Sequence, residues 1–343
     1  MRKGWLRSSL FYCPNIYICM NEYGNFIRRT DLIKNLVDRQ KLEEETKKPN
    51  RATQEANKRR WIAYQELLRQ EIAAGIASSV AVGGIVPPSL HFANGEKGVW
   101  FDAADITTLF QDVAGTQPVT AVGQYVGKWL DKSGNGKHAV AAANDTTRPT
   151  YQIDNEGNPN VTFTKTPATQ LFTTAIDFRS TDKMTVCIGI NVLDSGSAGV
   201  AIELGTDVNG ANNSGSFLIG APGATTDHSL YLRGTQVIRA AVNNVSDGDD
   251  IITGLFDISQ STGSLELIPR LNYVQLSGSN ITWSLNPDAG TGNFGNLPLF
   301  IGSRSGLGTP YGGKIYQIIV RGAQSTINQI TQFEKWVDSK LGE

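Results

Sequence analysis

Short β-forming runs separated by turn residues fill the chain from residue 98 onward. The runs are rich in Val, Ile, Thr, Phe and Tyr, and clusters of Gly, Asn, Asp and Ser divide them at short intervals. This pattern is typical of an antiparallel sandwich, in which turns join neighbouring strands. We therefore predict a mainly β chain built on an antiparallel β-sandwich. The predicted strands are VTFTK (161–165), KMTVCIGINVL (183–193), GVAIELG (199–205), SFLIG (216–220), SLYLRG (229–234), QVIRAAV (236–242), DIITGLFDIS (250–259), SLELIPRLNYVQLSG (264–278), LPLFIGS (297–303) and GKIYQIIVRG (313–322).

Two of these runs also indicate a place in the sheet. In GKIYQIIVRG, Ile315 and Ile319 alternate with Tyr316 and Ile318, so both faces of the run are apolar. A strand that is apolar on both faces is buried on both, which predicts a central position. Pro269 interrupts the longest run. Because proline has no N–H to donate, we expect a bend or a sheet edge there.

The last twenty residues follow a helical period instead. Ser325 or Thr326 is the predicted N-cap, since a hydroxyl there can accept a hydrogen bond from the first turn. Apolar residues then recur on one face, and we expect this face to lie on the sandwich. The predicted apolar face consists of Ile327, Ile330, Phe333, Trp336, Val337 and Leu341.

Residues 1 to 82 read as an N-terminal arm with two α-helices. Thr30 or Asp31 can cap the first helix, and the second begins near Ala52. The segment is small and has few large apolar groups, so it would form a marginal core by itself. We therefore expect its apolar residues to anchor the chain on another chain, either symmetry mates or a different protein. Packing on its own sandwich is the alternative. The predicted anchor residues are Leu32, Ile33, Leu36, Trp61, Tyr64, Leu68, Ile72 and Ile76.

A stretch of paired glycines and prolines separates this arm from the β-rich part. Because such pairs interrupt both helix and strand, they predict a linker. The resulting division is an arm over 1–82, a linker over 83–97, and a sandwich with its helix over 98–343. The arm carries 15 Lys and Arg against 9 Asp and Glu, a formal +6, while the remainder carries −7. This uneven distribution of charge bears on the partners that the chain binds and not on its fold. Nucleic acid is not favoured, because aromatic residues do not interleave with the basic ones.

Several classes of protein are excluded by simple counts. Three cysteines cannot build a disulfide framework, and no Cys and His spacing typical of zinc is present. No run of about eighteen apolar residues occurs, so no membrane span is predicted. Residues 1 to 20 imitate a signal peptide, but Arg7, Pro14 and Asn15 interrupt the apolar stretch. We expect an ordinary N-terminal arm.

The stretch VGKWLDKSGNGKHAV (126–140) combines a large aromatic anchor with a long polar turn. Trp129 is expected to be buried beneath the turn of residues 131 to 136. Upstream, GVWFDAADITTLFQD (98–112) places Trp100 before Asp102, and downstream RPTYQ (148–152) follows.

These motifs, in this order, resemble the opening of the concanavalin-A-like (laminin-G-like) jelly-roll domains of tailed-bacteriophage structural proteins. The segment IGSRSGLGTPYGGKIYQIIVRGAQST with the helix after it is similar to their closing part. The resemblance covers about residues 98 to 341 and leaves out the arm.

The resemblance implies a non-catalytic structural component of a virion, such as a capsid decoration, head fibre, neck or tail protein. The jelly roll would face outward and the helical arm would hold it. Partners would be other virion proteins, in a homo-oligomer for which a trimer is one option. The protein would be assembled in the host cytoplasm and located in the virion. A lectin-like adhesin for a host-surface glycan is the alternative, and a glycoside hydrolase is the third.

The carboxylates do not favour hydrolysis. Sandwich glycosidases of this kind carry Glu-x-Asp-x-x-Glu on one strand, so that alternation points acid and nucleophile into one cleft. Here Glu203 and Asp207 are separated by a glycine, and Glu266 is alone in its strand. No nucleophile elbow occurs either. We therefore expect no catalysis.

Candidate binding residues come from the turns and loops. Asp102, Asp131 and Asn135 offer oxygen ligands that suit calcium if they converge; otherwise no cofactor is expected. The alternative is that Asp131 and Asn135 only cap a turn. Tyr311, Trp283 and Asn293 lie in glycine-rich stretches, where sugar-binding sites tend to occur, and Tyr311 is a candidate glycan-binding residue.

Overall fold

The computed structural model describes residues 18–20 and 26–28 and, with gaps at 143–144, 207–212, 224–226, 244 and 246–247, residues 85–341. The chain divides into two units, Met1–Glu71 and Ile72–Glu343. In the first unit, strands β1 (Ile18–Met20) and β2 (Phe26–Arg28) pair antiparallel. The two helices predicted for the arm lie outside the described residues, and so do all eight predicted anchor residues: Leu32, Ile33, Leu36, Trp61, Tyr64, Leu68, Ile72 and Ile76.

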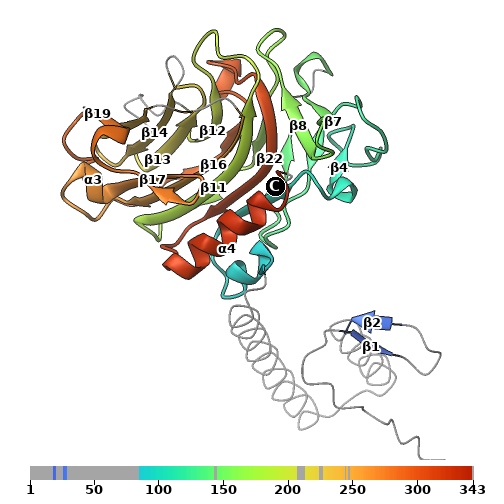
Figure 1. The fold of residues 1–343 in the computed structure, drawn as a ribbon, viewed down its shortest axis with the longest axis horizontal. Helices are drawn as coiled ribbons and strands as arrows, with labels where there is room; N and C mark the ends of the chain where they lie inside the picture. The colour runs from blue at the N-terminus through green and yellow to red at the C-terminus, as the bar shows by residue number, and fades with distance from the viewer. Residues whose placement is uncertain are drawn as a thin grey trace, which may run out of the picture. The chain divides into compact units, whose positions relative to one another are not determined.

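The second unit is an antiparallel β-sandwich, as predicted (Figure 1). One sheet has eight strands, in the order β18 (Val274–Gln275), β17 (Leu267–Leu271), β16 (Asp249–Asp257), β11 (Lys183–Val192), β22 (Gly313–Arg321), β8 (Pro159–Phe163) and β7 (Thr150–Ile153), with β3 (Gly98–Asp102) also paired to β22. The other has ten, in the order β19 (Ile281–Leu285), β15 (Val237–Val242), β14 (His228–Arg233), β13 (Ser216–Gly220), β12 (Val200–Leu204), β21 (Leu299–Ile301), β9 (Leu171–Thr173), β6 (Ala139–Val140), β5 (Lys128–Trp129) and β4 (Leu109–Phe110).

Short elements complete the unit. Strands β10 (Ile176–Asp177) and β20 (Asn296–Leu297) form a separate pair. The single-turn helices are η2 (Ile106–Thr108), η3 (Asp145–Thr147), α3 (Gly263–Glu266), η4 (Gly278–Asn280) and η5 (Ser305–Leu307). In the part of the chain that the structure describes, no helix is both long and apolar enough to cross a membrane.

The core lies between the two large sheets. On β11, Val186 and Ile188 belong to this core, while Cys187 between them belongs to a second apolar cluster on the outer side. This alternation follows from the period of two in a strand. Trp129 is fully buried in the core, as expected, and its ring lies 5.4 Å from that of Phe101.

The predicted central strand and the predicted position of the proline both agree with the structure. Strand β22 pairs with β11 on one side and with β8 and β3 on the other, which confirms its central place. Pro269 lies within β17 and pairs with Gly254 of β16, whereas the terminal strand β18 pairs only with Arg270 and Leu271, so Pro269 lies at the edge of the described sheet. The run turns three residues later, at Asn272 and Tyr273, where φ is 47° and 70°. Two consecutive positive φ angles are those of a tight hairpin turn.

The outer face of the eight-stranded sheet is covered. Helix α4 (Ile327–Asp338) begins at Thr326, whose hydroxyl accepts a hydrogen bond from the backbone N–H of Gln329 in a capping box. Phe333 and Val337 of this helix are buried against the sheet, and Figure 1 shows α4 lying across its strands. Ile327, predicted on the same face, is 60% exposed because it occupies the first turn.

Part of the predicted linker also belongs to this cover. Helix η1 (Pro88–Phe92) lies beside α4, and His91 meets Phe333 edge to face at 4.7 Å. The backbone N–H of Val86 donates to Gln332 Oε1 at 2.9 Å. Residues 86 to 92 are therefore packed on the sandwich, because the apolar side chains on either side of the two prolines, Val86 and Phe92, have a surface to bury against.

Candidate functional site

The turn after Trp129 is organised by Asp131. Its Oδ1 accepts hydrogen bonds from the backbone N–H of Trp100 and Ser133, at 3.0 and 2.8 Å. Its Oδ2 accepts from the Ser133 hydroxyl and the Lys137 N–H, at 2.9 and 3.1 Å. Both carboxylate oxygens therefore hold the turn together and join it to strand β3.

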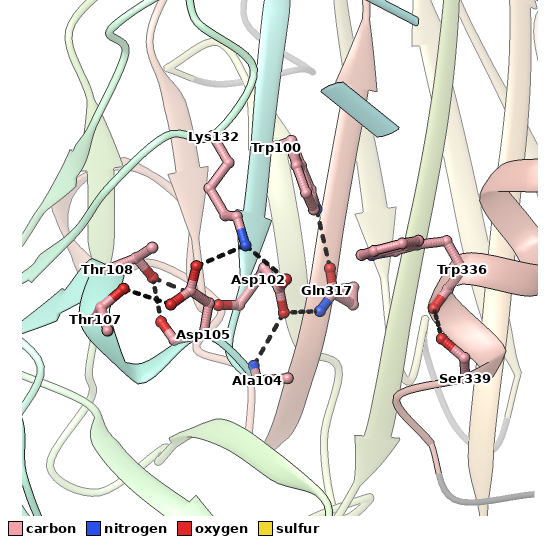
Figure 2. A network of polar contacts seen from close by, with 10 residues as sticks. All are labelled: Trp100, Asp102, Ala104, Asp105, Thr107, Thr108, Lys132, Gln317, Trp336 and Ser339. Carbon is pink, nitrogen blue, oxygen red and sulfur yellow. Dashed lines mark hydrogen bonds and ion pairs between the residues drawn. The ribbon is translucent and has the colours of Figure 1, made fainter. Parts of the chain in front are cut away.

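Asp102 lies in a neighbouring polar network, which Figure 2 shows. Lys132 Nζ is 3.0 Å from Asp102 Oδ2 and 2.7 Å from Asp105 Oδ2. Gln317 donates to Asp102 and accepts from the indole N–H of Trp100 at 3.1 Å. Burial acts to raise the pKa of Asp105, but the hydrogen bonds from Lys132 and Thr107, together with the charge of Lys132, outweigh it and the pKa is lowered.

The three proposed calcium ligands do not form one oxygen cluster. Asn135 uses its amide to donate to the carbonyl groups of Glu96 and Gly98, both at 3.0 Å. Asp131 holds the turn and Asp102 holds Lys132. Within the described residues, no group of three or more His, Cys, Asp or Glu side chains is placed to hold a metal ion.

Tyr311 is not an exposed loop residue. It is fully buried, and its hydroxyl donates to the carbonyl oxygens of Asn191 and Lys314, at 2.8 and 3.1 Å. Burial raises the pKa of Tyr311 well above its usual value. The expectation that it binds a glycan is therefore corrected: the glycine-rich stretch before it is a surface loop, but Tyr311 itself enters the core.

The other two loop candidates differ from Tyr311. Trp283 lies on strand β19 and is 39% exposed. The Asn293 amide donates to the carbonyl oxygen of Arg179 at 2.7 Å, which fixes its loop.

A hollow on the outer face of the ten-stranded sheet is a better candidate site. We call it the outer pocket; its volume is about 160 Å3. It lies on the side of this sheet that faces away from the core. The lining residues are Ala198, Gly199, Val200, Leu218, Gly220, Gly223, Tyr231, Arg304 and Thr309.

The floor of the outer pocket is apolar. Leu218 points outward because its neighbours Phe217 and Ile219 point into the core, and it pairs across the strands with Tyr231. The register of β12 shifts between Val200 and Ile202. Such a bulge redirects a side chain, and Val200 accordingly clusters with Leu218 and Tyr231 rather than with the core.

One wall of the outer pocket is Arg304, which forms an ion pair with Glu203. Arg304 Nη2 is 3.0 Å from Glu203 Oε1, and its Nε is 3.4 Å from Glu203 Oε2. The Glu203 side chain is fully buried and that of Arg304 is 19% exposed. Glu203 stands directly beside Leu218 in the strand register, so the pair borders the apolar floor.

A second arginine holds the aromatic residue of the pocket. The Arg239 guanidinium lies 5.7 Å from the centre of the Tyr231 ring. It also donates to the Ser229 hydroxyl at 2.7 Å and pairs with Asp227 at 3.2 Å. These contacts fix Arg239, and Arg239 in turn limits the positions that the Tyr231 ring can take.

The loop that contributes Arg304 and Thr309 has an unusual backbone. Leu307 and Thr309 have φ angles of 63° and 47°. Positive φ is uncommon outside glycine and is an outlier for a β-branched residue, and such strain concentrates at binding and catalytic sites. Gln170 secures the loop by donating to the carbonyl oxygen of Arg304 at 2.6 Å.

Sequence reasoning missed the outer pocket for a definite reason. Its residues come from strands and loops that are far apart in the chain and meet only through strand pairing. The one available signal was an apolar residue at an outward position of a strand, as at Leu218, but the bulge that adds Val200 has no sequence signature.

Comparisons with known proteins find similarity among solved structures but not among sequences. No protein-family model matches the chain, and no curated protein sequence does. Among solved structures, domain 4 of AbnA, a GH43 extracellular arabinanase from Geobacillus stearothermophilus, in complex with arabinotriose, has 12% identity and a TM-score of 0.45 over 70% of this chain and 98% of that one.

Two toxin binding domains resemble this chain with comparable identity and TM-score. The botulinum neurotoxin serotype D ligand binding domain, in complex with N-acetylneuraminic acid, has 9% identity and a TM-score of 0.42 over 61% of this chain and 48% of that one. The binding domain of Paraclostridial Mosquitocidal Protein 1 has 10% identity and a TM-score of 0.44, over 65% and 54%. The chain thus spans about half the length of these toxin domains.

Proposed function

We propose that the sandwich is a non-catalytic glycan-binding module that takes one sugar unit in the outer pocket. The observation that carries the proposal is the composition of this pocket: an apolar floor and a tyrosine beside an arginine and a threonine. Ligand sites combine an apolar lining with a few polar groups that fix orientation. The volume of about 160 Å3 suits a single small ring or the end of a longer chain.

The chemistry of the pocket fits a sugar in two respects. A pyranose presents C–H groups on its faces and hydroxyl groups around its rim. Leu218 and Tyr231 offer apolar and aromatic surface to the faces, while Arg304 and Thr309 offer hydrogen-bonding groups to the rim.

The arrangement of carboxylates supports binding without hydrolysis. A retaining or inverting glycosidase needs two carboxyl groups flanking one glycosidic bond. Glu203 is buried and paired with Arg304. Glu266 is also buried and accepts a hydrogen bond from the backbone N–H of Ala289 at 2.7 Å. Neither is a lining residue of the outer pocket.

A virion structural role is the second candidate. It rests on the resemblance of the motifs around Trp100, Trp129 and the closing helix to tailed-phage jelly-roll domains. In this reading the protein is located in the virion, its helical arm contacts other virion proteins in a homo-oligomer, and the sandwich is an outward head. The two candidates are compatible, since an attachment module can itself be part of a particle.

A glycan array probed with the full chain tests the proposal. Binding should be lost in Tyr231→Ala and retained in Trp283→Ala, which removes an exposed aromatic residue of the same sheet that does not line the pocket. Circular dichroism should show that both variants are folded. A folded protein that retains no glycan would reject glycan binding and favour the structural head.

A further inference from the structure

We infer that the outer pocket selects a saccharide that carries an anionic group, a carboxylate or a sulfate, and that Arg304 selects it. This inference rests on the proposed glycan-binding function and adds the class of glycan. Four observations lead to it: the charge of the lining, the burial of the partner carboxylate, the fixed position of the guanidinium, and the apolar floor.

The charge of the described lining is that of Arg304. Among the nine described residues that line the outer pocket, Arg304 is the only one with a charged side chain. Glu203, which pairs with Arg304, is the cross-strand neighbour of Leu218 on the outer face, but its side chain is fully buried and that of Arg304 is 19% exposed. A ligand that enters the pocket therefore meets the guanidinium rather than the carboxylate.

The guanidinium of Arg304 is held in place before any ligand arrives. Its Nε and Nη2 contact the two oxygens of Glu203. Its backbone N–H donates to the carbonyl oxygen of Gly308 at 2.8 Å, and its own carbonyl accepts from Gln170. A planar, preorganised guanidinium loses little further freedom on binding and matches the geometry of a carboxylate or a sulfate.

The apolar floor strengthens the attraction between Arg304 and an anionic group of the ligand. Val200 and Leu218 are each 4% exposed and form the floor beside the cation. Charges that meet over an apolar surface are screened less than in bulk water. A sugar ring placed on this floor would bring an acidic substituent at its edge toward Arg304.

A purely structural role for the Glu203–Arg304 ion pair leads to a different expectation. If Glu203 and Arg304 only stabilise the loop, then changing either of them alters the stability of the protein and leaves the ligand preference unchanged. If Arg304 reads an anion, removal of the Glu203 charge alone should favour acidic ligands, whereas removal of both charges should abolish the preference.

The experiment uses the full chain and immobilised neutral, carboxylated and sulfated glycans. Calorimetry then measures the affinity for the acidic glycan that binds most tightly and for its neutral parent. The neutral parent has a hydroxymethyl group in place of the carboxylate, or a free hydroxyl in place of the sulfate. We expect the acidic form to bind about tenfold tighter, as a charge-assisted hydrogen bond would give. Separate arms for carboxylated and sulfated glycans identify which anion the pocket takes.

Three variants make the test specific. Glu203→Gln should tighten binding of the acidic glycan. The double variant Glu203→Gln with Arg304→Gln, which removes both charges of the ion pair, should bind acidic and neutral forms equally. Arg179→Gln, which removes an exposed arginine elsewhere on the surface, should leave the preference unchanged. Thermal unfolding of each variant checks that it is folded.

Each outcome decides one point. The inference is supported if the wild type prefers acidic glycans and the double variant loses that preference. Binding of neutral glycans with no acidic preference overturns the inference and leaves the proposed function in place. A preference that survives in the double variant also overturns it. If no glycan is retained by the folded wild type, the proposed function fails and the inference fails with it.

Discussion

Arg270 of strand β17 and Glu334 of helix α4 form a bidentate ion pair, with Nε–Oε1 at 2.7 Å and Nη2–Oε2 at 3.0 Å. Their side chains are only 8% and 1% exposed. A residue of the terminal helix is thereby joined to a strand 64 positions earlier in the chain. The pair fixes α4 on the outer face of the eight-stranded sheet.

Removal of one partner of this pair should be costly. We expect Glu334→Ala to lower the free energy of unfolding by about 3–5 kcal/mol, because Arg270 would remain as a buried charge without its partner. The double variant with Arg270→Met should recover much of the loss, since no charge is then buried alone. Urea denaturation measures both values. A single variant as stable as the wild type would contradict the assignment of α4 to this sheet.

Trp129→Ala should lower the free energy of unfolding by about 3–5 kcal/mol, because a large, fully buried side chain is removed from the core. The control is Trp283→Ala, where the side chain is 39% exposed and the loss should be clearly smaller. Equal midpoints of thermal unfolding for the two variants would show that Trp129 does not support the turn.

Stability should fall as the pH is lowered, in part through His91. Burial, aided by Arg321 and weakly opposed by Glu96, lowers the pKa of His91 from 6.5 to about 4. Between these two values the unfolded chain binds a proton that the folded chain does not, so acid favours unfolding. The loss due to His91 approaches about 3 kcal/mol. In urea denaturation at pH 7 and pH 4.5, His91→Gln should lose less stability than the wild type. Equal losses would contradict this.

Removal of metal should leave the Asp131 turn intact. Both oxygens of Asp131 already accept hydrogen bonds from protein donors, so a chelator should not change the midpoint of thermal unfolding. Asp131→Ala, in contrast, should cost about 2–4 kcal/mol, because buried N–H groups lose their acceptor. A midpoint that drops with chelator and returns with calcium would revive the calcium hypothesis.

Tyr311→Phe should reduce stability by about 1–2 kcal/mol and leave ligand binding unchanged. The variant loses the hydrogen bonds from its hydroxyl to Asn191 and Lys314 but keeps the buried ring. Urea denaturation and the glycan array measure the two effects. Loss of glycan binding with normal stability would return Tyr311 to the list of candidate site residues.

The strands and the terminal helix could be predicted because local patterns determine them. The run at 216–220 coincides with β13, and the hydroxyl of Thr326 caps α4 as its place before the apolar period indicated. Pro269 could be placed at a sheet edge because its missing N–H is not needed there, but the turn at Asn272 and Tyr273 was not predicted, since it lacks the usual glycine.

The candidate site could not be predicted in the same way. Whether Tyr311 enters the core or stays in the loop depends on which strand its neighbours join, and that is a long-range property. Val200 and Arg304 come together only after β12 pairs with β13 and the loop after β21 folds back. The packing of residues 86 to 92 depended likewise on the surface that α4 provides.

The position of η1 and α4 on one sheet has a practical consequence. The described chain of this unit begins at Ile85 beside η1 and reaches its last residues just beyond α4, both on the face opposite the outer pocket. A tag, bead or sensor chip coupled at Ile85 or at Leu341 would lie behind the sandwich. Immobilisation through these positions should therefore leave the pocket accessible to large, branched ligands.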